Sequence, residues 1–194
     1  MARCAIFASG TGSNFEQLEK SLRKHPVHSV ACLVCDKPSA PVVTKALSAG
    51  IPVVPITYTR SSHGILDRST AEKKTASILH SLGVDCIALA GFMKILSPAL
   101  LTEFPNRILN IHPSLLPHHP GAHGMRDSIE SADTVLGITI HIVDSGVDTG
   151  PILAQRSFTR TSSESPASEE LRIHQLEHEA YPQVLLEFMD TIRH

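Results

Sequence analysis

The stretch "RCAIFASGTGSNF", residues 3–15, decides the fold class of this chain. Its first part, Arg3–Ser9, is an apolar run typical of a buried strand. Two glycines then lead into a helical pattern in which Phe15, Leu18 and Leu22 form one apolar stripe. A strand that turns tightly into a helix is the first half of a β–α–β unit. The opening of the chain therefore predicts an α/β protein.

The alternation of strands and helices continues along the chain. Ala76, Leu79 and Leu82 form a second helical stripe. Further strands are expected at four apolar runs: Val30–Cys35, Ile51–Ile56, Asp85–Ala90 and Arg107–His112. Nearly continuous apolar strands that alternate with helices indicate an open, mostly parallel, doubly wound sheet with helices on both faces.

The pattern changes after Gly121. Two further strands, Val135–Asp144 and Pro151–Arg160, are expected to form a late antiparallel pair joined by a turn. A long C-terminal helix should follow, with Ser165 as its N-cap, Pro166 at its first position and a kink at Pro182. Because no repeat or long linker divides the sequence, we expect a single domain over residues 1–194.

Composition excludes several classes of function. The net charge is −2 and there is no long basic run, which argues against a nucleic-acid partner. The N-terminal apolar run is too short for a signal peptide or a membrane span, so we expect a cytoplasmic protein without a membrane partner. The four cysteines should be reduced and at least three of them buried in strands. Cys32 and Cys35 have C-x-x-C spacing, but they lie inside an apolar run and lack a second ligand pair.

In open α/β sheets, ligands bind where loops leave the carboxyl ends of the strands, and the first such loop is rich in glycine. Gly10 and Gly12 allow a tight turn, the amides at the helix start would face an anion, and Ser13 and Asn14 add donors. Phe15 replaces the third glycine of a dinucleotide fingerprint, and the ending of a Walker loop is missing. A tight turn without a ligand explains the loop equally well. The functional interpretation is a site for a single phosphate.

The second loop, Leu89–Pro98, presents the apolar side chains of Phe92, Met93, Ile95 and Leu96. A turn buried in the core explains these residues as well as a binding site does. If the loop lines a pocket, the pattern predicts a guest that is partly flat and apolar.

The third loop follows the stretch "LNIHPSLLPHHPGAH", residues 109–123. Asn110 and His112 alternate on a strand, so both can face the same space, and Pro113 and Pro117 stiffen the chain behind them. An amide donor beside an imidazole suits an oxyanion and a proton transfer. A metal site is the alternative, but the spacing of its candidate ligands is irregular and we expect no metal. Those candidates are His112, His118, His119, His123 and His141.

The turn between the late strands, "HIVDSGVDTGPIL", carries two carboxylates, Asp144 and Asp148. Either one could serve only to form the turn. Two glycines in the same stretch already supply the turn, however. A carboxylate near His112 would orient the imidazole and raise its basicity. Asp148 is therefore a candidate partner of His112.

Six motifs in order together resemble the family of phosphoribosylglycinamide formyltransferases. They are "ASGTGSN", "LAGFMKILSP", "LNIHPSLLP", "PGAHG", "GITIHIVDSGVDTGPILAQ" and "IHQLEHEAYP". The resemblance implies a Rossmann-like formyltransferase fold. It also implies transfer of a formyl group from 10-formyltetrahydrofolate to the amine of N1-(5-phospho-D-ribosyl)glycinamide. The products would be formylglycinamide ribonucleotide and tetrahydrofolate, in de novo purine (IMP) biosynthesis.

The resemblance also implies roles for individual residues. His112 would donate the proton, Asn110 would position the formyl group and its oxyanion, and Asp148 would support the histidine. Ribonucleotide binding would fall to Gly12, Ser13 and Asn14 at the phosphate and to Glu177 at the amine end. The folate-binding set would be Arg68, Met93, Lys94, Ile95, Leu96, Asn110, Asp144, Ser145, Gly146, Val147 and Asp148, with the backbone of 144–148 at the pterin ring. His141, Thr139 and His123 would have supporting roles, and no metal would take part.

The chain departs from the family pattern at a few positions. Thr11 stands where Asn or Ser is commoner, and Lys94 replaces a frequent arginine but keeps its charge. Thr57–Lys74 matches poorly apart from Arg68, so the role of that arginine is the weakest assignment. Residues 1–105 would form the half that binds the ribonucleotide phosphate, and residues 106–194 the half for catalysis and folate binding.

Related enzymes use the same catalytic trio on other acceptors. Methionyl-tRNA formyltransferase adds a basic C-terminal domain and formyltetrahydrofolate hydrolase adds an N-terminal regulatory domain. This chain ends at His194 and its phosphate loop begins at Gly10. A hydrolase-like enzyme or another folate-dependent formyltransferase stays as an alternative, and a non-catalytic phosphate-binding module as a remote one. The expected partners are small-molecule substrates, and the expected state is a monomer or a homodimer.

Overall fold

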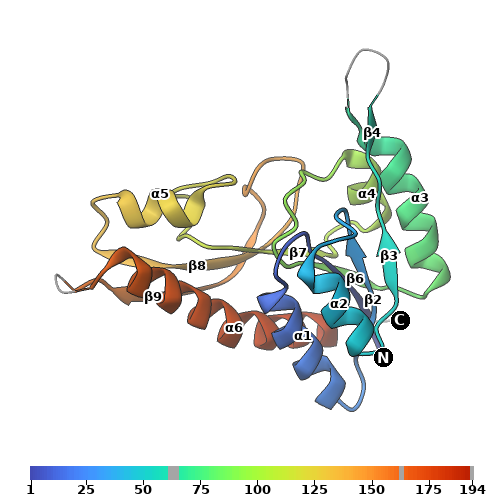
Figure 1. Cartoon of the computed structure of the whole chain (residues 1–194), viewed down its shortest axis with the longest axis horizontal. Helices are drawn as coiled ribbons and strands as arrows, with labels where there is room; N and C mark the ends of the chain where they lie inside the picture. Colours follow the sequence, from blue (N-terminus) through green and yellow to red (C-terminus); the bar gives the residue numbers. More distant parts are fainter. Residues whose placement is uncertain (61–65, 162–163, 193–194) are drawn as a thin grey trace.

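A seven-stranded sheet organises the chain, and five of its strands run parallel (Figure 1). The computed structural model describes residues 1–60, 66–161 and 164–192. The order of the strands in the sheet is β3-β2-β1-β6-β7-β8-β9. The strands are β1 (Arg3–Phe7), β2 (Ser29–Cys35), β3 (Val53–Pro55), β6 (Cys86–Leu89), β7 (Ile108–His112), β8 (Val135–Ile142) and β9 (Ile152–Thr159). Because β8 and β9 pair antiparallel, the predicted mostly parallel sheet with a late antiparallel pair is confirmed.

Helices cover both faces of the parallel strands. They are α1 (Ser13–Lys24), α2 (Pro41–Ser48), α3 (Arg68–Ser81), α4 (Pro98–Glu103), α5 (Gly124–Glu130) and α6 (Pro166–Thr191). Side chains alternate along β1, so Cys4 and Ile6 pack in the core beneath α1, α2 and α6, while Ala5 and Phe7 pack with α3 and α4. This two-sided packing explains why the strands are apolar on both faces. It leaves the carboxyl ends of β1, β6 and β7 open for a site.

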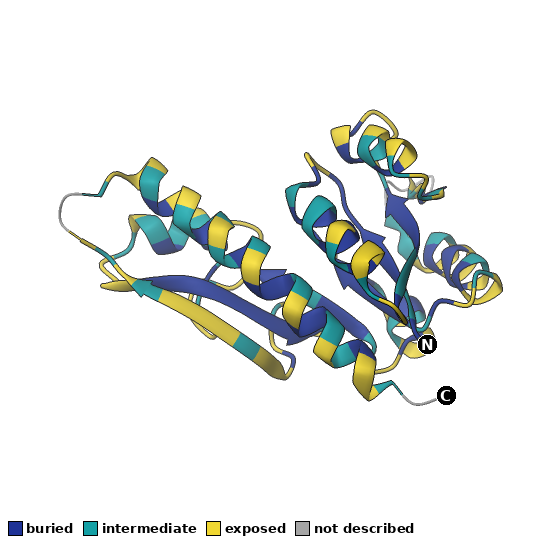
Figure 2. Cartoon of the chain, turned by 90° about the horizontal axis from the view of Figure 1, so that it is seen from below, coloured by how far each residue is buried: buried dark blue, intermediate teal, exposed yellow. Residues whose placement is uncertain are grey.

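The late strands differ in burial. Figure 2 shows β8 as almost wholly buried and β9 as largely exposed at the edge of the sheet. β8 is paired with β7 on one side and β9 on the other, in a register that sets Asn110 opposite His141 and His112 opposite Thr139. The polar side chains of β8 therefore lie inside the protein beside the predicted catalytic strand.

The structure corrects several predicted boundaries. The expected strand Ile51–Ile56 shortens to β3 because Pro52 and Pro55 have no N–H to donate to a sheet. The sequence did not predict α2, α4, α5 or the small hairpin of β4 (Thr59–Arg60) and β5 (Leu66–Asp67), which are all short. The poorly matching segment 57–74 includes residues 61–65, which lie outside the described residues.

The four cysteines are free and buried within strands, as predicted. They are Cys4 on β1, Cys32 and Cys35 on β2, and Cys86 on β6. Across the described parts of the chain, no helix has the length and apolar character needed to cross a membrane.

The C-terminal helix is tied to the sheet by one buried hydroxyl. α6 begins as predicted, with the side chain of Ser165 accepting from the amide of Ser168, and it continues unbroken past Pro182. The hydroxyl of Tyr181 donates to the carbonyl of Leu89 (3.0 Å), the last residue of β6, and to the carbonyl of Leu109 (3.2 Å), within β7. Tyr181 thus links α6 to both strands that carry the site.

We predict that Tyr181→Phe lowers the free energy of unfolding by about 1–3 kcal/mol, because two buried carbonyls lose a donor. Chemical denaturation measures the change. Tyr58→Phe is the matched control, since Tyr58 is the chain's other tyrosine and makes one 3.3 Å bond to Glu72. Glu72 keeps the amide and hydroxyl of Ser97 in that variant, so a smaller loss is expected. Equal losses would mean that the Tyr181 hydroxyl has no special role.

Candidate active site

A cavity of about 540 Å³ opens at the carboxyl ends of β1, β6 and β7. It is lined by residues 10–14 after β1, 89–96 after β6 and 110–113 at the end of β7. Residues 121–122 between β7 and α5, residues 141–148 at the end of β8 and in the loop after it, and the helices α5 and α6 complete its wall. The cavity brings together most of the predicted site: Gly12, Ser13, Asn14, Met93, Lys94, Ile95, Leu96, Asn110, His112, His141, Asp144, Gly146, Val147, Asp148 and Glu177.

The glycine loop is built to present backbone amides. Gly12 is the N-cap of α1 with φ +77°, and it offers no side chain to occupy the first amides of the helix. A Cβ at this position would lie 2.6 Å from Cγ2 of Val42, so only glycine fits. The amides of Ser13 and Asn14 begin the helix beside the cavity. The arrangement suits an anion such as a phosphate.

The predicted trio is assembled around one carboxylate. Oδ2 of Asp148 lies 3.3 Å from Nδ1 of His112 and accepts a 2.8 Å hydrogen bond from the amide of Gly121. Oδ1 lies 3.5 Å from Nδ2 of Asn110 and from Nε2 of His141. The hydrogen bond with His141, the amide of Gly121 and the charge of His112 hold the pKa of Asp148 at about 2, against the opposing effect of burial. The carboxylate is therefore charged at any working pH.

Both ring nitrogens of His112 face oxygen atoms. Nδ1 faces Asp148, and Nε2 lies 2.8 Å from the carbonyl oxygen of His119. A neutral ring would point one lone pair at an oxygen, whereas the doubly protonated ring donates to both. The loop can approach this closely because residue 124 is glycine: a Cβ there would lie 2.5 Å from Nε2 of His112. The geometry suits a buried imidazolium that can release a proton.

The wall opposite the trio is apolar and accessible. Met93 and Ile95 are 60% and 56% exposed although they are large and apolar, and both line the cavity. Nζ of Lys94 lies 3.8 Å from Oδ2 of the buried Asp36. A flat, partly apolar molecule with a charged end fits such a wall.

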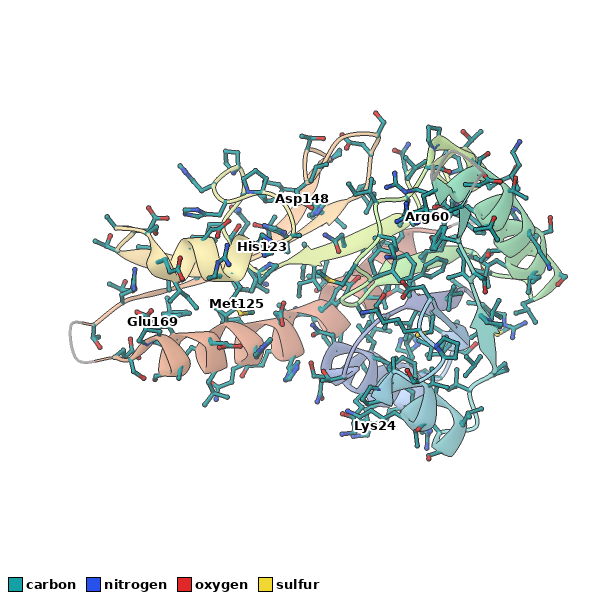
Figure 3. The ribbon with its side chains drawn as sticks, turned by 45° about the horizontal axis from the view of Figure 1, so that its top comes forward. Lys24, Arg60, His123, Met125, Asp148 and Glu169 are labelled. Carbon is teal, nitrogen blue, oxygen red and sulfur yellow. The ribbon has the colours of Figure 1, made fainter. Side chains whose placement is uncertain are left out.

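Four predicted residues lie outside the cavity lining. Thr139 is buried and supports the loop behind His112, because its hydroxyl accepts from the amide of Leu116 and donates to the carbonyl of Ser114. Ser145 lies between lining residues of the loop after β8. Figure 3 shows His123 at the start of α5 and Asp148 on the loop between β8 and β9.

The fourth of these residues is Arg68. It opens α3, near Tyr58 and Glu72. Arg68 does not line the cavity, but Glu72 of the same helix accepts hydrogen bonds from Ser97, which follows the folate candidates 93–96.

The histidines of the metal alternative have different contacts, except that His112 and His141 share Asp148. His119 pairs with Asp133 at 2.7 Å, and His123 occupies the N-cap position of α5 without a side-chain capping hydrogen bond. Within residues 1–60, 66–161 and 164–192 no three His, Cys, Asp or Glu side chains are arranged to hold a metal ion.

Sequence reasoning missed two features of the site. The first is the amide of Gly121, which as a backbone group carries no signal in the sequence. The second is His174, whose Nδ1 lies 2.8 Å from Oε2 of Glu177 and which lines the cavity. Its position one helical turn before Glu177 was a usable signal.

Comparisons with known proteins identify the family. A family model described as formyl transferase matches residues 2–185. Phosphoribosylglycinamide formyltransferase of Bacillus subtilis (strain 168) is 38% identical over 190 residues, which are 97% of this chain and 95% of that protein. Trifunctional purine biosynthetic protein adenosine-3 of Drosophila melanogaster is 36% identical over 186 residues, which are 94% of this chain and 14% of that protein. The crystal structure of glycinamide ribonucleotide transformylase 1 from Geobacillus kaustophilus superposes with a TM-score of 0.89 at 37% identity, over 97% of this chain and 99% of that one.

We predict that Gly12→Ala weakens the binding of ribose 5-phosphate by at least about tenfold. The left-handed backbone costs roughly 1–2 kcal/mol for a residue with a Cβ, and the loop must also move away from Val42. Calorimetry measures the affinity. Gly10→Ala is the control on the same loop, because a Cβ there meets no atom within 4 Å. Equal losses in both variants would remove Gly12 from the phosphate site.

Proposed function

This chain belongs to the formyl transferase family, and we propose that it is a phosphoribosylglycinamide formyltransferase of de novo purine biosynthesis. Its reaction transfers the formyl group of 10-formyltetrahydrofolate to the amine of N1-(5-phospho-D-ribosyl)glycinamide. The observation that carries this proposal is one cavity that holds both an anion-binding helix start and the cluster of Asn110, His112 and Asp148. The first feature suits the phosphate of the acceptor, and the second suits acyl transfer.

The chemistry requires a donor at the formyl oxygen and a proton for the leaving nitrogen. The substrate amine attacks the formyl carbon, and the carbonyl oxygen becomes an oxyanion that Nδ2 of Asn110 stabilises. The carbon–nitrogen bond to the folate then breaks, the amine loses a proton and the folate nitrogen gains one. His112 supplies that proton as a general acid, and its neutral ring then takes up the proton that the amine loses. The charge of Asp148 stabilises the protonated ring and holds its orientation.

The ligands divide the cavity between two ends. The phosphate lies at the amides of Ser13 and Asn14. Nδ2 of Asn14 donates to Glu177, so this carboxylate lies near the phosphate loop and suits the ribose hydroxyls better than the amine end named from the sequence. The apolar wall, Met93 to Leu96, and the backbone of 144–148, Ser145 included, receive the folate.

The remaining roles are assigned by proximity. His141, Thr139 and His123 have supporting roles at the strand and loop that carry the trio. Tyr58 lies within electrostatic reach of both Arg68 and Asp36, the partner of Lys94. We therefore keep Arg68 as a contact for the carboxylate end of the folate.

Further parts of the proposal concern the whole protein. Residues 1–105 provide the phosphate site and residues 106–194 the catalytic groups, although the folate wall and Glu177 cross that boundary. The reaction uses no metal, and its partners are the two small molecules rather than a nucleic acid or a membrane. The enzyme works in the cytoplasm as a monomer or homodimer, and four free cysteines fit a reducing compartment.

An assay with competing acceptors tests the function. The enzyme receives 10-formyltetrahydrofolate together with glycinamide ribonucleotide, methionyl-tRNA and water, and the formylated products are quantified. We expect formylglycinamide ribonucleotide to dominate. Dominant release of formate would support a hydrolase-like enzyme, formylated tRNA would support another formyltransferase, and no turnover would support a phosphate-binding module.

We predict that Asp148→Asn lowers kcat by a factor of ~10²–10⁴ with little change in KM, because general acid catalysis loses the charge that supports it. His112→Ala should have a comparable effect. The double variant should lose little more than the worse single variant, since both residues serve one proton transfer. Steady-state kinetics of the three variants measures this coupling, with Asp127→Asn, a partly exposed carboxylate on α5 outside the cavity lining, as control. Strictly additive losses would reduce Asp148 to a turn residue.

A further inference from the structure

His174 is a titratable group in the cavity that the mechanism above does not use. It lies on α6 one turn before Glu177, and it lines the same cavity as residues 10–14. Figure 1 shows α6 running beside α1, whose first turn forms the phosphate loop. The side chain is 39% exposed, so it is reached by solvent and by a bound ligand.

The imidazole is one end of a chain of contacts to the phosphate loop. Nδ1 of His174 lies 2.8 Å from Oε2 of Glu177, and the same oxygen accepts from Nδ2 of Asn14 at 3.2 Å. Glu177 is 4% exposed. Because Oε2 already has two donors, Oε1 is left to receive a hydroxyl of a ligand. Oδ1 of Asn14 is buried and has no hydrogen-bond partner in the described part of the chain, so it too can accept from a ligand.

The charges around His174 come from two helices. On α6 they are Glu170, with Oε1 3.9 Å from Nε2, together with Glu177 and His178. The facing helix α1 contributes Glu16 and Lys20, which act on His178. Residues 10–14 carry no charged side chain. Lys94 also lines the cavity, but it lies on the folate wall. When protonated, the imidazole of His174 is therefore the positive side chain at the end of the cavity formed by residues 10–14.

We propose that His174 is a positioning residue of the ribonucleotide site, which holds the carboxylate of Glu177 and strengthens phosphate binding when its ring is protonated. This inference rests on the proposed function. When the ring is neutral, the buried charge of Glu177 is uncompensated and repels the dianionic phosphate. Ribonucleotide affinity then falls while the chemistry at His112 is unaffected.

The direction of the pH dependence follows from the contacts. The hydrogen bond to Glu177 raises the pKa of His174 above its usual 6.5, against the opposing effect of burial. The cation is therefore present below and through pH 6.5 and is lost as the pH rises past the raised pKa. The KM for the ribonucleotide should rise over that interval. By linkage, ribonucleotide binding should take up part of a proton from solution.

His174→Gln separates charge from position, since glutamine can still donate to Glu177 but does not titrate. We measure kcat and both KM values across the pH range for wild type and variant. The phosphate and amine of the substrate titrate in the same way with both enzymes. The ratio of the ribonucleotide KM of the variant to that of wild type therefore reports the protonation of His174 alone. We expect the variant to have a ribonucleotide KM about tenfold higher near pH 6, as for the loss of one charge-assisted contact, and that ratio should approach one at high pH. kcat and the folate KM should stay close to wild type.

His178→Gln is the matched control, because His178 is the next histidine on the same helix, its ring stacks on His174 and it lies outside the cavity lining. Burial lowers the pKa of His178, so its loss should leave the KM profile unchanged. Three results would overturn the role of His174. They are the same dependence of ribonucleotide KM on pH in His174→Gln and wild type, an equal effect of His178→Gln, and a fall in kcat rather than in ribonucleotide affinity.

A binding experiment separates this inference from the proposed function. Calorimetry of wild type with ribose 5-phosphate, in two buffers of different ionisation enthalpy, measures the proton uptake without any turnover. Uptake that His174→Gln abolishes supports the inference even if the acceptor assay fails. Absence of uptake in an enzyme that formylates the ribonucleotide would overturn the inference and leave the function standing.

Discussion

The carboxylate of Asp148 is the contact on which the site depends. It joins three segments that are far apart in the sequence: the end of β7, the loop that contains Gly121, and the loop after β8. Its own backbone is left-handed, with φ +55°, so the loop presents the carboxylate at some cost in backbone energy. Three surrounding groups, His141, the amide of Gly121 and His112, stabilise the anion more than burial destabilises it, and the charge persists throughout the working pH range. The proposed hydrogen-bond donor, proton source and charge are thus held together without a ligand.

The sheet makes that convergence possible. Parallel strands bring the phosphate loop and the catalytic strand to one edge, and the antiparallel pairing of β7 with β8 sets His141 opposite Asn110. Tyr181 then fastens α6 to the same two strands, and the turn before it carries Glu177. The proposed ribonucleotide and folate sites therefore share one support.

Much of this could be predicted from the sequence, for identifiable reasons. Apolar runs marked the strands, and the alternation of Asn110 and His112 placed both on one face, because strand geometry has period two. The amide of Gly121 and the carbonyl of His119 could not be predicted, since backbone groups are the same at every residue and their direction depends on loop dihedrals. The role of Arg68 stays a prediction, because the sequence match alone does not say how near its side chain lies to the cavity. His174 was readable from its spacing but looked like an ordinary helix residue.

Gly124 has a consequence for anyone who would redesign the protein. A side chain at residue 124 would collide with both His112 and the carbonyl of His119. The loop and the histidine therefore keep their packing only with glycine at this position. A library aimed at new formyl donors has freedom at Met93 and Ile95, whose side chains are largely exposed. It has none at residue 124, where a Cβ would lie 2.5 Å from Nε2 of His112 and would force that ring or the loop to move. Natural substitution meets the same difference: the apolar wall of the cavity tolerates changes of side chain, whereas residue 124 does not.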